Sequence, residues 1–166
     1  MKKGENYAYS GESGSGFPHL HIEIRNTQGK AVNPFFMLNS PMEDKRSPRM
    51  QSLIVRARDT TLINHETREW EGRLNPDQSG IYTLGTPLTI DGPSDWIIVG
   101  EDISDTGRPV APYRIRFTLD KDVLVNIEFN ELTRQQNPQV GLVYDRQYSA
   151  MGHYAYTLYA QPGNTL

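Results

Sequence analysis

Two histidines and a glutamate occupy alternate positions in the stretch SGFPHLHIEI, residues 15–24. On a β-strand, alternate residues point to the same side, so His19, His21 and Glu23 would share one face. Imidazole nitrogen and carboxylate oxygen are zinc ligands, and a catalytic zinc ion keeps three protein ligands and a water molecule. The two histidines could therefore be two ligands, or one ligand and one acid–base group. A solvated polar strand face is the alternative, and an H-x-H pattern alone does not separate these interpretations.

The residues around this motif indicate how it would be positioned. Leu20, Ile22 and Ile24 alternate with the polar residues, so we expect them to be buried on the opposite face of the strand. The small-residue loop GESGSG precedes the strand and would let the backbone approach a ligand closely. Pro18 then fixes the entry into the strand.

Residues 2–38 resemble the closing segment of the lysostaphin/LytM-type zinc endopeptidases. That segment contains a K-G-x-x-[IV]-A-x-S-G-x-[ST]-G stretch, a G-x-P-H-L-H-[FI]-E-[IVL]-R strand and a V-[ND]-P tail. The matching residues here are Lys3-Gly4, Ala8, Ser10-Gly11, Ser13-Gly14, Pro18 through Arg25, and Val32-Asn33-Pro34. The resemblance implies that His21 is a zinc ligand and that His19 is a catalytic histidine, which stabilises the metal-bound water and the tetrahedral intermediate. The implied chemistry is zinc-assisted hydrolysis of amide bonds in peptidoglycan peptides.

The chain departs from the family pattern in its remaining zinc ligands. The family takes two ligands from an upstream H-x(3)-D motif, whereas the other histidines here, His65 and His153, follow the H-x-H segment. The residue four places after His65 is Glu69, so HETRE does not supply the motif. We interpret His65 and His153 as ordinary surface or core histidines. We expect the chain to be a fragment of a peptidase, inactive alone and without a complete zinc site, because catalytic zinc needs three protein ligands.

Composition excludes several other classes of protein. The 166 residues carry a net charge of −3, and no long basic run supports a nucleic-acid partner. Cysteine is absent, which excludes disulfides and a thiol nucleophile. No apolar run is long enough for a membrane span, and MKKGENYAYSGESGSG lacks the apolar region of a secretion signal.

Period-2 alternation of apolar residues predicts an all-β fold. The expected strands cover 52–58, 95–102, 113–120, 123–129, 140–145 and 153–160. Strands 113–119 and 123–129 should form an antiparallel hairpin, with Phe117 and Ile127 in the core. We predict three parts: the final strands of a peptidase sheet at 1–38, a linker at 39–49, and an immunoglobulin-like β-sandwich at 50–166, which could be incomplete.

Residues 50–166 are similar, more weakly, to the β-rich region that follows the peptidase domain in Bacteroidetes-type envelope members of the same family. The similar stretches are PLTIDGPSDWIIVGEDISD, APYRIRFTLDKDVLVNIEF, VYD and the closing QPGN. This resemblance implies a periplasmic or extracellular location at the cell envelope, with accessory positioning or wall binding as the role of the region.

Three smaller groups of residues have both a functional and a structural interpretation. Glu101, Asp102 and Asp105 could bind calcium, although such loops are more often plain turns. Tyr154, Tyr156 and Tyr159 could stack on sugars, although packing is the commoner role of tyrosine on a half-buried sheet. Arg114 and Arg116 should form a solvated strand face.

Three functional hypotheses follow. The first is a piece of a peptidoglycan zinc endopeptidase. The second is a non-catalytic envelope-binding or scaffold protein that keeps a peptidase remnant. The third, a cupin-like metal barrel, is disfavoured because further ligands are not suitably spaced. As final strands of a sheet, residues 1–38 should need a neighbour, and we expect them to pack against the β domain or, preferentially, against another chain.

Overall fold

The computed structural model describes residues 2–6, 9, 11–12, 16, 18, 22–37, 45–104 and 107–166. Its strands are β1 (Ile24–Arg25), β2 (Ala31–Val32), β3 (Arg49–Ala57), β4 (Glu69–Arg73), β5 (Asn75–Pro76), β6 (Tyr82–Thr83), β7 (Ser94–Ile103), β8 (Pro109–Val110), β9 (Arg114–Leu119), β10 (Asp122–Glu128), β11 (Glu131–Leu132) and β12 (Ala155–Thr157). Its helices are the short η1 (Pro34–Met37), η2 (Asn137–Leu142) and α1 (Arg146–Ala150). The predicted all-β class is confirmed. Within the described ranges, no helix has the length and apolar character needed to cross a membrane.

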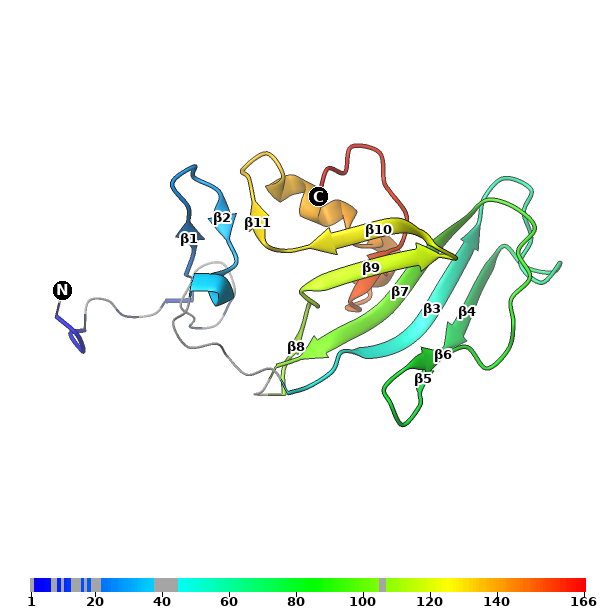
Figure 1. Ribbon diagram of the computed structural model, residues 1–166, viewed down its shortest axis with the longest axis horizontal. Coiled ribbons are helices and arrows are strands. Elements are labelled where there is room, and N and C mark those ends of the chain that lie inside the picture. The colour runs from blue at the N-terminus through cyan, green and yellow to red at the C-terminus, as the bar shows by residue number, and fades with distance from the viewer. Residues whose placement is uncertain are drawn as a thin grey trace.

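An antiparallel sheet with the order β12–β7–β3–β4 forms the centre of the molecule, and β8 pairs with the end of β7 (Figure 1). The predicted strands 52–58 and 95–102 are β3 and β7. Their alternating register places Leu53 opposite Ile98 and Ile54 opposite Ile97. Both strands are rich in β-branched residues because apolar side chains are buried on both faces of the sheet.

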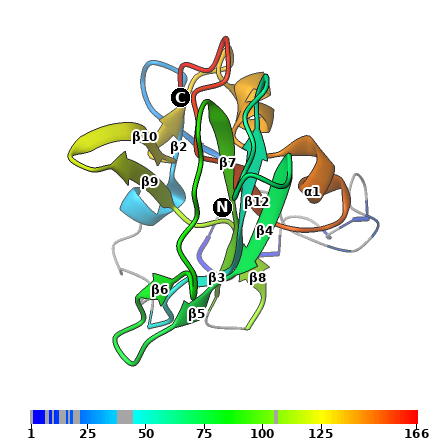
Figure 2. The same cartoon turned by 90° about the vertical axis from the view of Figure 1, so that its right-hand side faces the viewer.

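The β9–β10 hairpin covers one face of this sheet, whereas α1 lies on the opposite side (Figure 2). Leu53 and Val55 of β3 form a buried cluster with Ile115, Val125 and Ile127 of the hairpin. On the other face, Ile54 and Ile97 are packed with Tyr148 of α1. The layering is therefore sandwich-like, with a small helical cover on the second face.

The predicted hairpin at 113–129 is confirmed. Asp120 turns the chain with a φ of 51°, a left-handed conformation that aspartate tolerates better than most residues. Ile127 is buried, and Phe117 is half-buried against the same core, with its ring centroid 5.7 Å from that of Trp96. Val123 does not continue the inward alternation of Val125 and Ile127. The register shifts between Val123 and Val125, so Val123 pairs with Thr118 on the outer face.

The prediction of a strand at 140–145 is wrong for residues 140–142. Residues Asn137–Leu142 form the 3₁₀ helix η2, with Pro138 in its first turn, where a missing N–H is tolerated. Strand-like pairing begins only at Val143, whose carbonyl accepts a hydrogen bond from the Thr157 N–H at 2.9 Å. The strand predicted at 153–160 is confirmed as β12, in a shorter form.

The amino-terminal strands pack against the β domain of the same chain. In Figure 1, the β1–β2 hairpin lies beside β11, and Ala31 and Val32 of β2 pair with Leu132 and Glu131 of β11. Packing against the β domain is one of the two arrangements that we expect from the sequence, and pairing with another chain is the one that the sequence favours. The predicted linker begins outside the described residues, and its last residues, 45–48, have no regular secondary structure before β3 starts at Arg49.

Candidate functional site

The two candidate zinc-site histidines, His19 and His21, lie outside the described residues, as does Leu20. The rest of the motif is described from Ile22 onward. Glu23 is exposed and forms an ion pair with Arg25, with Oε1 and Nε 2.6 Å apart. Residues two apart therefore meet on one side of the chain, as expected for an extended segment.

The expected burial of Ile22 is wrong, because its side chain is 66% exposed. Strand pairing starts only at Ile24, opposite Val32, so Ile22 precedes the first paired residue. Ile24 itself is half-buried. The apolar face that the alternation predicts is thus covered only from Ile24 onward.

Polar contacts on both sides of β2 fix the end of the motif segment to the β domain. The Asn26 side chain organises the hairpin turn, since its Oδ1 accepts hydrogen bonds from the N–H groups of Gln28 and Lys30 at 3.0 and 3.1 Å. Lys30 then forms an ion pair with Glu131 of β11. These contacts hold the hairpin in one register against β11.

Asn33, in the V-N-P part of the motif, links the hairpin to both η1 and the β domain. Its Oδ1 accepts the Phe35 N–H at 3.1 Å, an N-cap contact, and Pro34 occupies the first helical position. Its Nδ2 donates to the Phe129 carbonyl at 3.1 Å. A single asparagine therefore orients η1 and ties it to the end of β10.

An apolar groove of about 440 Å³ lies at the junction between η1 and the β domain. Its lining is aromatic and aliphatic, with one amide: Asn33, Phe35, Phe36, Ala111, Pro112, Tyr113, Phe129, Leu132, Val140 and Tyr144. The rings of Phe36 and Tyr113 meet edge to face with centroids 5.9 Å apart. Such a surface can bind apolar or ring-containing groups, but it carries no set of groups for acid–base chemistry.

The strongest described polar cluster surrounds Arg56 of β3. Its Nε donates to Glu69 Oε2 at 2.8 Å, its Nη1 to Asp145 Oδ2 at 3.0 Å, and its Nη2 to Gln147 Oε1 at 3.2 Å. Asp145 is buried and also caps α1 by accepting hydrogen bonds from the N–H groups of Gln147 and Tyr148. Burial alone would lower the pKa of Arg56, but the hydrogen bonds to Glu69 and Asp145 outweigh it and raise that pKa. This cluster docks α1 on the sheet.

Tyr148 completes the cluster, because its hydroxyl donates to Glu69 Oε1 at 3.1 Å. Burial and the negative charge of Glu69 raise the pKa of Tyr148 to about 12. The hydroxyl therefore stays protonated at neutral pH and acts as a donor, not as a base. The hydrogen bonds of Tyr148 and Arg56 therefore hold α1 on the sheet and do not form a catalytic site.

The smaller candidate groups have structural roles where they are described. His65 is exposed, with its Nδ1 2.8 Å from Asp91 Oδ2, and His153 is also exposed. Tyr156 is buried in the core with its ring 5.1 Å from that of Tyr144, so the interpretation as packing is confirmed and a sugar-stacking patch that includes Tyr156 is excluded. Arg114 lies on the exposed face, paired with Glu128 at 3.2 Å.

The proposed calcium group is described only in part, because Asp105 lies outside the described residues. Asp102 Oδ1 accepts the N–H of Ile103 at 2.8 Å, a local backbone contact. Across the described ranges, no three histidine, aspartate or glutamate side chains converge in a way that could hold a metal ion.

The sequence analysis did not predict the cluster around Arg56, nor a cleft at the start of β3 that is lined by Arg49, Ser52, Arg73 and Glu101 among others. In the sequence SLIVRAR, Arg56 has no feature that separates it from an ordinary solvated residue. Its partner Asp145 lies 89 residues away, so the sequence pattern does not indicate the contact. The one available signal was Asp145 itself, an N-cap residue type immediately before a short polar helix.

Comparison of the chain with models of protein families, with curated proteins and with solved structures found no match.

Proposed function

We propose that this chain is part of a zinc metalloendopeptidase that cleaves peptidoglycan peptides at the cell envelope. In this proposal His21 is a zinc ligand and His19 is the catalytic histidine beside the metal-bound water. The two further ligands come from an H-x(3)-D motif outside these 166 residues, so the chain alone is inactive. Zinc would lower the pKa of its water and polarise the scissile carbonyl.

The observation that carries this proposal is the combined sequence motif, in which P-H-L-H-I-E-I-R leads into the β1–β2 hairpin and V-N-P follows it. The Glu23–Arg25 contact is what an extended H-x-H-x-E segment would produce. The link between β2 and β11 joins the hairpin that follows the H-x-H segment to the β domain. A metal ligand needs such support to keep its orientation.

A second candidate function is a non-catalytic envelope-binding or scaffold protein. The apolar groove between η1 and the β domain favours it, because aromatic side chains such as Phe35 and Phe36 are exposed there. Under this alternative the histidines have no catalytic role.

The full reading frame of the gene tests the choice between these functions. We expect an in-frame H-x(3)-D motif before the codon of Met1, and cleavage of cell-wall peptides by the protein expressed from that longer frame. His19→Ala should reduce cleavage at least about 100-fold, because a positioned acid–base group contributes 10²–10⁴-fold. His65→Ala is the matched control and should leave the rate unchanged. Absence of the motif, or absence of cleavage by the protein from the longer frame, would favour the binding protein. Full activity of His19→Ala would contradict the catalytic role of His19.

A further inference from the structure

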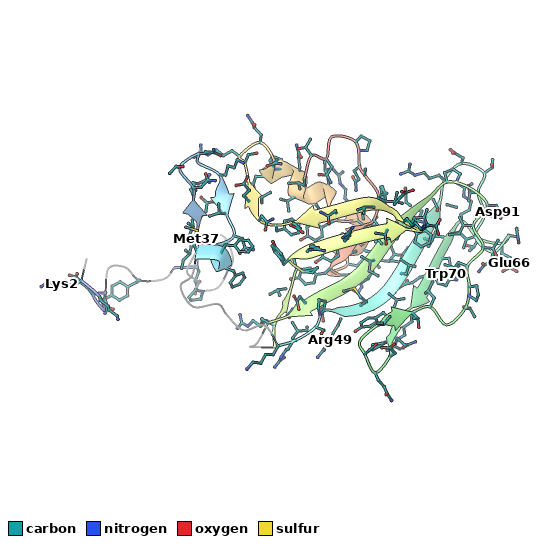
Figure 3. All side chains as sticks on the ribbon, viewed as in Figure 1. Lys2, Met37, Arg49, Glu66, Trp70 and Asp91 are labelled. Carbon is teal, nitrogen blue, oxygen red and sulfur yellow. The ribbon has the colours of Figure 1, made fainter. Side chains whose placement is uncertain are left out.

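A polar cleft of about 750 Å³ opens at the end of the central sheet where β3 begins. Its residues come from the first residues of β3, the end of β4, Glu101 of β7 and the β5–β6 hairpin. Figure 3 labels Arg49, at the start of β3, where this cleft lies. The lining contains charges of both signs, in contrast to the apolar groove.

A β-bulge shapes the cleft. The register between β3 and β7 shifts between Met50 and Ser52, which leaves Gln51 as an extra residue. Gly100 lies opposite Met50, and a Cβ at Gly100 would approach the Arg49 carbonyl oxygen to 2.8 Å and the Met50 sulfur to 2.6 Å. The bulge therefore depends on a glycine, and it directs Arg49 and Ser52 to the cleft.

Several polar side chains of the cleft have no internal partner. Ser52 is only 7% exposed, yet its hydroxyl makes no hydrogen bond within the described part of the chain. Arg49 and Glu101 lie directly opposite each other but form no ion pair. The guanidinium of Arg73, next to Ser52 in the register, likewise has no hydrogen bond or ion pair to any described residue. Ser52 Oγ is not among the described buried polar atoms that lack a hydrogen bond, so the hydroxyl reaches the surface of the cleft, where an external partner can bond it.

We propose that this cleft binds a peptide that carries both a carboxylate and an ammonium group. Arg49 and Arg73 present the planar donors that suit carboxylates, and Glu101 and Glu71 supply the negative charge for an ammonium group. The Ser52 hydroxyl bonds the peptide backbone. Because the cleft lies in residues 49–101, this inference does not depend on zinc or on the H-x-H segment.

Calorimetric titration of the chain at low salt with N-acetyl-glutamyl-alanyl-lysine amide tests the inference. N-acetyl-glutaminyl-alanyl-glutamine amide, which has no charge, is the comparison peptide. We expect the charged peptide to bind at least about tenfold more tightly, because hydrogen bonds to charged groups are stronger than neutral ones. Arg49→Gln and Arg73→Gln should each weaken its binding about tenfold. Arg116→Gln, on the distant β9–β10 hairpin, should not.

Ser52→Ala separates binding from folding. It should weaken peptide binding about threefold or more, as expected for one lost hydrogen bond, without lowering the unfolding midpoint. Failure of the charged peptide to bind, equal binding of the two peptides, or an equal loss in Arg116→Gln would overturn the proposal. A lower unfolding midpoint for Ser52→Ala would also contradict it, since the hydroxyl would then have an internal partner.

Discussion

Ile127→Ala should lower the free energy of unfolding by about 2–5 kcal/mol. Ile127 is 5% exposed and belongs to the cluster between the β9–β10 hairpin and β3. Truncating it removes buried apolar surface and leaves a cavity between two layers that cannot collapse fully. Because small domains are stable by about 5–15 kcal/mol, this loss should be visible as a large shift in the urea midpoint.

Leu119→Ala is the matched control for this prediction. Leu119 lies on the same hairpin but is 53% exposed, beyond the part that packs on the sheet. Its truncation should change the free energy of unfolding by less than about 1 kcal/mol. Equal losses in the two variants would mean that the hairpin does not cover the sheet as described.

Arg56→Met should destabilise the protein by about 2–3 kcal/mol, although methionine retains much of the apolar stem. The substitution removes the guanidinium that bonds Glu69, Asp145 and Gln147. It leaves the carboxylate of Asp145 buried with only the helix N–H groups as donors. Chemical unfolding monitored by circular dichroism measures the effect.

Two further variants show whether the loss comes from the buried cluster. Arg114→Met breaks the exposed ion pair with Glu128 and should cost less than about 1 kcal/mol. In a double-mutant cycle with Asp145→Asn, the losses at Arg56 and Asp145 should be less than additive, because either change removes the same contact. Additive losses would show that Arg56 does not stabilise α1 through Asp145.

The sequence pattern predicts much of the central fold. Residues 52–58, 95–102 and 113–129 have strong alternation or short β-branched runs, and their burial against each other follows from those patterns. What the pattern could not predict is where alternation breaks. The bulges after Val123 and at Gln51 each add one residue, and each reverses the faces of the residues beyond it.

Contacts between segments that are far apart in the sequence were also not predictable from the pattern of each strand. The VGLVYD stretch contains two β-branched residues, yet its first half belongs to the 3₁₀ helix η2, which has Pro138 in its first turn. Only the second half pairs with β12, through the hydrogen bond from the Thr157 N–H to the Val143 carbonyl. The cluster around Arg56 and the cleft around Ser52 both join residues from strands far apart in the sequence. Period-2 patterns identify the faces of strands, but they do not say which strands become neighbours.

Calorimetric titration of zinc tests most directly whether the H-x-H segment belongs to a zinc endopeptidase. This chain alone should show no tight stoichiometric site, because it supplies one ligand, His21, in its family position. The protein from the longer reading frame with an H-x(3)-D motif should bind one zinc ion per chain, and His21→Ala should weaken that binding at least about tenfold. A tight site in the 166-residue chain, or zinc binding by the longer protein that His21→Ala leaves unchanged, would contradict the proposed function.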